Sequence, residues 1–211
     1  MKRNQLFKLI AVSIILTSAV AYLHAFVVFN DIYPVFDSPD ARNVETLTID
    51  GTSYFLKSNA DVFLLLNEVE IGYPNALHFQ NALGLTRSAL NKLNIARERY
   101  LQIINLASGS GYTGHKIQRL NQFNYAGFAD SHNLDGKIMK QVELYFKHGD
   151  IIGLYRENIK NIDSILLLLG DIETQLSEGT APPISSFWSL LQQFSSAVIL
   201  GNYSTMVFNN M

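Results

Sequence analysis

Residues 151–178 read IIGLYRENIKNIDSILLLLGDIETQLSE, and apolar side chains recur through this stretch about every 3.5 residues. The apolar positions are Ile152, Tyr155, Ile159, Ile162, Leu166, Leu169, Ile172 and Leu176. Such spacing gathers them on one side of an α-helix, where they can be buried against other helices. The stretch therefore predicts a long amphipathic helix at the centre of a helical core.

The segments on both sides of this stretch also have helical patterns. Residues 58–61 resemble a capping box that opens a helix, which should stop at Gly72 or Pro74. A second helix is expected from Asn75 to about Ser108, and a third over residues 136–148. Gly179 should end the central helix, with Pro182 and Pro183 at the start of a last one. The stripe of that last helix is Phe187, Leu191, Phe194 and Val198.

One segment has the pattern of a β-hairpin. Residues 45–57, ETLTIDGTSYFLK, alternate on both sides of Asp50-Gly51, a pair that suits a two-residue turn. A lone hairpin is marginal in water, so its apolar face should lie on helices. The predicted fold is mainly α: a bundle of four or five helices with a small N-terminal β-hairpin, preceded by an N-terminal hydrophobic helix.

The N-terminus has the pattern of an export segment. Lys2, Arg3 and Lys8 precede an apolar run from Leu9 to Phe29, and acidic residues follow it. This charge order keeps the N-terminus in the cytoplasm and exports the rest. The run is long enough for an uncut membrane anchor, since about 20 residues cross a bilayer. Cleavage of a signal peptide at Ala21 or Ala25 remains the alternative.

These patterns predict four parts of the chain. Residues 1–29 form the signal-anchor or signal peptide, and residues 30–44, which hold two prolines, form a linker. The hairpin takes residues 45–57, and the helical bundle domain takes residues 58–211. The predicted location is extracytoplasmic, in a bacterial periplasm.

Composition narrows the classes of partner. The net charge is −2 and there is no cysteine, so the sequence indicates no nucleic-acid partner, no disulfide framework and no thiolate metal site. The membrane is the expected partner of the N-terminal segment. A protein partner or self-association is expected for the bundle.

Residues 109–116, GSGYTGHK, come close to a phosphate-binding loop. In that motif a lysine follows the second glycine and a hydroxyl residue follows the lysine. Here His115 and Lys116 hold those two positions, and the preceding segment has a helical rather than a strand pattern. The stretch is interpreted as a glycine-rich reversal after a helix.

The sequence offers one candidate contact site, in residues 119–132. Phe123, Tyr125 and Phe128 alternate with amide side chains there, and His132 follows them. These four residues are proposed to contact a ligand or a partner, or else to cap the bundle core under a loop. No catalytic, cofactor-binding or metal-ligating residue is predicted, because the histidines and carboxylates lack the spacings of known sites.

Three functional hypotheses follow from these observations. The first is a membrane-anchored or secreted extracytoplasmic helical bundle that serves as a structural or interaction accessory subunit of an envelope-associated assembly. The second is a small-molecule binding protein with an aromatic-lined site near residues 119–132. The third is an enzyme whose site is built from dispersed residues, such as His78 or His132 beside a carboxylate. The first is preferred, so the protein is predicted not to be an enzyme and to need no cofactor.

Overall fold

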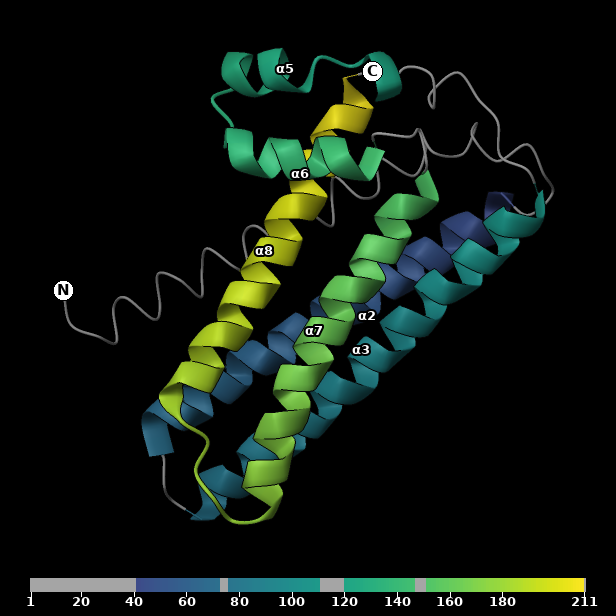
Figure 1. Cartoon of the computed structure of the whole chain (residues 1–211). Coiled ribbons are helices and arrows are strands. Elements are labelled where there is room, and N and C mark those ends of the chain that lie inside the picture. The colour runs from purple at the N-terminus through teal and green to yellow at the C-terminus, as the bar shows by residue number, and fades with distance from the viewer. Residues whose placement is uncertain (1–40, 73–75, 111–119, 147–150, 211) are drawn as a thin grey trace.

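The chain is mainly helical. The computed structural model describes residues 41–72, 76–110, 120–146 and 151–210, and no strand occurs among them. The helices are α2 (Ala41–Gly72), α3 (Ala76–Ser110), α5 (Tyr125–Ser131), α6 (Gly136–Phe146), α7 (Ile151–Ser177) and α8 (Ile184–Asn209). Figure 1 shows the four long helices as a bundle, with the short α5 and α6 across one end.

The long helices pack in a fixed order. α2 and α3 lie against each other as an antiparallel pair, α3 contacts α7, and α7 contacts α8. The rings of Phe55 and Phe194, 5.4 Å apart, join α2 to α8 and close the bundle. α6 contacts both α7 and α8, which fixes the α5–α6 layer to the end where α7 begins and α8 finishes.

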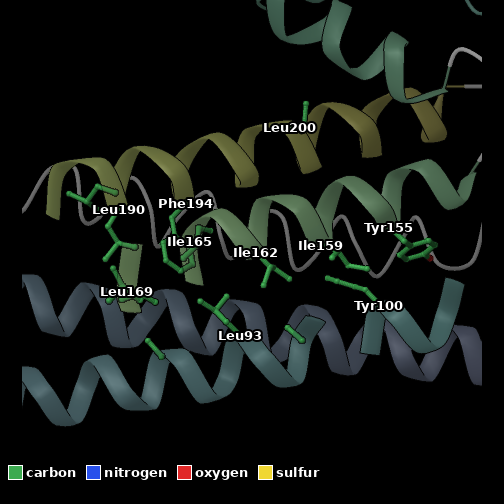
Figure 2. Packing of buried hydrophobic residues seen from close by; sticks show 14 of the residues in the cluster. Leu93, Tyr100, Tyr155, Ile159, Ile162, Ile165, Leu169, Leu190, Phe194 and Leu200 are labelled. Carbon is green, nitrogen blue, oxygen red and sulfur yellow. The ribbon is translucent and has the colours of Figure 1, made fainter. Parts of the chain in front are cut away.

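The core lies between α2, α3, α7 and α8. Figure 2 shows Ile162, Ile165 and Leu169 of α7 between Leu93 of α3 and Phe194 of α8. Ile165, Leu169 and Phe194 have no exposed surface at all. Burial of such side chains stabilises the fold by about 1.5–3 kcal/mol each. The central position predicted for residues 151–178 is confirmed.

Several predicted helix ends are also confirmed. α2 stops at Gly72, and α3 and α7 lie within two residues of their expected bounds. Gly179 has a φ of +75°, the left-handed conformation expected at the end of α7. The predicted stripe of the last helix, from Phe187 to Val198, is buried.

The predicted β-hairpin is wrong. Residues 45–57 lie inside α2, which is continuous from Ala41 to Gly72. The alternating pattern of this segment also fits a helical stripe, because Thr48, Gly51, Ser58 and Val62 are all buried on one side of α2. Gly51, expected in a tight turn, instead faces Tyr100 of α3. Packing against α3 favours the helix over the hairpin.

The first helix of the bundle therefore begins at Ala41 rather than at residue 58. Ser58 caps no helix, since it is a fully buried residue within α2. Residues 41–44 of the predicted linker belong to the same helix. The remainder of that linker and the N-terminal hydrophobic segment lie outside the described residues.

Two further sequence features bear on the membrane and phosphate predictions. α3 continues through Gly109 to Ser110, so a helix and not a strand leads into GSGYTGHK. Residues 111–116 of that stretch lie outside the described part of the chain. Over the residues described, no helix combines the length and apolar character needed to cross a bilayer.

Candidate functional site

The four predicted contact residues form one aromatic cluster, with Tyr125 and Phe128 on α5 and Phe123 and His132 on either side of it. The ring of Phe123 lies 5.1 Å from that of Tyr125 and 5.2 Å from that of Phe128. Phe128 in turn stacks on His132 at 4.1 Å between ring centres. The structure therefore brings together all four residues of the predicted site.

The inner part of this cluster belongs to the core. Tyr125 is buried, and Phe123 and Phe128 pack against buried core residues. The Tyr125 hydroxyl donates to the carbonyl oxygen of Leu120 at 2.9 Å. Burial, and then the negative charge of Glu143, raise the pKa of Tyr125. Tyr125 is thus a neutral structural residue, and the partly exposed Phe128 and the exposed His132 form the outer edge.

A tight helix cap holds the cluster in place. The side-chain oxygen of Asn124 accepts a hydrogen bond from the backbone N–H of Gly127 at 3.0 Å. A Cβ atom at residue 127 would lie only 2.4 Å from the Asn124 amide nitrogen. Glycine at this position is what lets Asn124 cap the helix and so fixes the direction of α5.

His132 is held by local groups. Its Nδ1 atom lies 2.9 Å from the Ser131 hydroxyl and 3.0 Å from the carbonyl oxygen of Phe128. A carbonyl oxygen only accepts, so Nδ1 is the donor in the contact with Phe128. Asp135 is used elsewhere, since its carboxylate caps α6 at the N–H of Lys137. Among the described residues, no group of three or more histidines and carboxylates is arranged to hold a metal ion.

A surface groove lies elsewhere, between the first turns of α2 and the last turns of α3. Its volume is about 490 Å³, and its lining residues are Asn43, Thr46, Leu47, Gln102, Asn105 and Leu106. The aromatic cluster contributes no residue to it. No local sequence pattern predicts this groove, because residues 43–47 and 102–106, which form its two sides, are far apart in the chain.

Ion pairs join α3 to both of its neighbours. On the α2 side, Asp50 pairs with Arg99, Asp61 with Lys92, and Glu68 with His78, at 2.7, 2.6 and 2.6 Å. On the α7 side, Asp163 pairs with Arg97 and Glu173 with Arg87, at 2.6 and 2.8 Å. In each pair α3 supplies the basic group. The His78–Glu68 pair, which an enzyme hypothesis would start from, is thus one member of a series that aligns helices.

Buried hydroxyl groups make a second set of contacts between helices. Thr52 of α2 is hydrogen-bonded to the Tyr100 hydroxyl of α3 at 3.1 Å, and Thr48 to the Tyr155 hydroxyl of α7 at 3.3 Å. The two tyrosine rings lie 5.9 Å apart. Burial raises the pKa of Tyr100 to about 12 and also raises that of Tyr155. Both hydroxyls stay protonated near neutral pH, so they are structural groups rather than bases.

Exposed apolar side chains are the remaining feature. Among the described residues they are Leu64, Leu144, Leu167, Ile184 and Trp188. Ile184 and Trp188 stand one turn apart on α8, at 49% and 39% exposure. Neither residue belongs to the apolar stripe predicted for the last helix, although the lack of charge around them is visible in the sequence.

The chain matches no protein-family model, and neither the curated proteins nor the solved structures contain a significant match to it.

Proposed function

We propose that this protein is an extracytoplasmic helical bundle, anchored by residues 9–29 or secreted, that serves as an interaction subunit of an envelope-associated assembly. The anchor rests on the charge order and length of the N-terminal segment. A helical bundle offers long, stiff surfaces on which partner helices can pack.

The observation that carries the proposal is how the chain uses its polar groups. The pairs between α2, α3 and α7 join carboxylates to cations across helix contacts, and the buried tyrosines are paired with threonines. These groups stabilise the bundle and specify which helices meet. Some large apolar side chains, in contrast, remain exposed, as Ile184 and Trp188 do. This division favours a scaffold with contact surfaces over a catalyst.

The test is purification of the tagged full-length chain from detergent-solubilised membranes, followed by mass spectrometry. We expect a second protein in stoichiometric amount and an intact N-terminus. A chain recovered alone from the soluble fraction, trimmed after Ala21 or Ala25, would contradict both the anchor and the assembly.

Small-molecule binding is the second candidate, and the groove between α2 and α3 favours it. The groove has a volume of about 490 Å³, is largely open to solvent and includes the partly buried Leu47 and Leu106 in its lining. For this candidate we propose a ligand in the groove beside Leu47 and Leu106, as an alternative to the aromatic-lined site near residues 119–132. Native mass spectrometry of the protein from its own cells would detect a bound molecule as added mass. Loss of that mass in a Leu106→Trp variant, with the wild-type mass retained in Phe128→Ala, would assign it to the groove.

A further inference from the structure

The outer side of α8 differs from the rest of the described surface. All 16 basic and 18 acidic residues of the chain precede residue 179, so α8 carries no charged side chain. Other helices present charges to solvent, for example Arg87 on α3, Lys140 on α6 and Lys160 on α7. An exposed helix usually gains solubility from charge, and its absence over a whole helix needs a physical reason.

The inner and outer sides of α8 are clearly separated. Leu190 and Phe194 point toward α7 and are buried (Figure 2). The opposite side is exposed in the first half of the helix, where Ile184, Ser185, Trp188, Gln192 and Ser196 lie. We call these five residues the α8 face.

The neighbouring half of α8 is already covered within the molecule. α6 crosses the second half of α8, and Leu200, Ser204 and Val207 are buried there. Gln193, Leu200 and Val207 are spaced seven apart and so lie on one side of the helix, yet only Gln193 is exposed. The α8 face thus borders a helix contact inside the molecule.

We infer that the α8 face binds the same face of a second copy of this chain, with the two α8 helices parallel about a two-fold axis. In a parallel symmetric pair, each residue near the axis meets its own copy. Any charge there would face a like charge, which costs free energy, and an uncharged face avoids this cost. Ile184 and Trp188 supply apolar and aromatic contacts of the kind that dominate such interfaces. The inference rests on the proposed function, because membrane anchors on one side of a bilayer require the parallel arrangement.

If residues 9–29 anchor the chain in the bilayer, the α8 face lies too far from the bilayer to bind it. α2 begins at Ala41, and its Thr48 is hydrogen-bonded to Tyr155 near the start of α7. The start of α2 therefore lies at the end of the bundle that carries α5 and α6. α8 begins at the other end, after the α7–α8 turn. An anchor joined at Ala41 leaves Ile184 and Trp188 on the far part of the bundle, within reach of another protein.

Cross-linking tests the pairing and its direction. The chain has no cysteine, so each variant introduces a single thiol. The three test variants are Ser185→Cys, Gln192→Cys and Ser196→Cys, and the control is Asn94→Cys at an exposed position of α3. In native membranes, a short bis-maleimide should give dimers with all three α8 variants and not with the control. Dimers at only one α8 position would indicate an antiparallel crossing, and equal yields with the control would indicate no α8 interface; either result overturns the inference.

A charge test separates this inference from the proposed function. Gln192→Glu and Gln192→Lys are near in size to the native residue, and each should lower the yield of dimers between differently tagged copies by about tenfold or more. Co-expression of the two variants should restore the dimer yield. The control Gln141→Glu, at an exposed position of α6, should leave the yield unchanged. Unchanged dimer yield in Gln192→Glu would overturn the inference. A different protein retained by wild type, without self-association, would support the assembly while rejecting the second copy.

Discussion

At the scale of single residues, two hydroxyl groups on the inner side of α2 differ in their partners. The Thr52 hydroxyl is hydrogen-bonded to the Tyr100 hydroxyl, whereas the Ser58 hydroxyl is buried with no hydrogen-bond partner. A buried polar group without a partner loses the hydrogen bonds that it makes with water in the unfolded chain. Ser58→Ala is therefore expected to leave the free energy of unfolding unchanged or to raise it by about 1 kcal/mol.

The matched change is Thr52→Val, which keeps the shape and removes the hydroxyl. It leaves the buried Tyr100 hydroxyl unpaired and should lower the free energy of unfolding by about 1–3 kcal/mol. Urea denaturation followed by circular dichroism measures both variants. A loss of stability in Ser58→Ala equal to that in Thr52→Val would show that the Ser58 hydroxyl has a partner in solution.

Tyr100 makes the free energy of unfolding depend on pH above about pH 10. Its pKa rises from the ordinary 10.0 to about 12 on folding, because burial outweighs the effect of the hydrogen bond with Thr52. Above pH 10 the unfolded chain loses this proton while the folded chain keeps it. The contribution of Tyr100 is thus complete below pH 10 and is lost as pH rises toward 12, by about 1.4 kcal/mol per pH unit.

Tyr100→Phe removes this titration and leaves that of Tyr155. Urea denaturation at pH 9, 10 and 11 should show a shallower fall in unfolding free energy for Tyr100→Phe than for wild type. Comparing the two slopes isolates the contribution of Tyr100. Identical slopes would mean that Tyr100 is ionised as easily in the folded chain as in the unfolded one.

At the scale of the elements, Gly51 sets how closely α2 approaches α3. A Cβ atom at this position would lie 3.1 Å from Cε1 of Tyr100 and 3.2 Å from Cβ of Arg99. The larger side chain in Gly51→Leu would push the two helices apart. We expect its unfolding free energy to fall by about 1–3 kcal/mol.

Gly84→Leu on α3 is the control for helix propensity, since a Cβ there meets nothing within 4 Å. Leucine favours a helix over glycine by up to about 1 kcal/mol, so this variant should be more stable than wild type. Thermal unfolding of both variants gives the comparison. A stabilised Gly51→Leu would show that the contact between α2 and α3 is looser than the structure indicates.

The same glycine explains which elements the sequence could predict. α7 was predictable because its buried positions keep a helical period over the whole helix, so local pattern and packing agree. In residues 45–57, the pair Asp50-Gly51 suits the turn of a hairpin, and Gly51 also suits a helix that needs a small residue where it meets α3. The choice depends on Tyr100, about fifty positions away, so local pattern alone selected the wrong structure.

The candidate sites show the same dependence on sequence distance. The aromatic cluster was predictable because Phe123, Tyr125, Phe128 and His132 lie within ten positions and α5 gathers them locally. The groove and the ion pairs join residues of separate helices, and their formation follows from the antiparallel register of α2 and α3. Periodicity predicts the face of a helix but not its register with a neighbour.

At the scale of the whole molecule, the register of the bundle gives it two distinct ends. The Thr48–Tyr155 contact marks the end that carries α5 and α6, and the Glu68–His78 and Glu173–Arg87 pairs lie toward the other end. α7 has 27 residues, so the ends are separated by about 40 Å. Under the proposed anchor, the α5–α6 end is nearer the bilayer and the α7–α8 turn is farther away.

Single fluorophores can test this orientation on a cysteine-free chain. Lys137→Cys on α6 and Thr180→Cys after α7 both introduce exposed thiols, and each labelled full-length variant is reconstituted in vesicles that contain a headgroup quencher. The label at 137 should be quenched more strongly than the label at 180, because the chain enters the bundle at the end that holds α6. Stronger quenching at 180 would invert the orientation and bring the α8 face to the bilayer. Equal, negligible quenching at both positions, with the protein free of the vesicles, would reject the anchor itself.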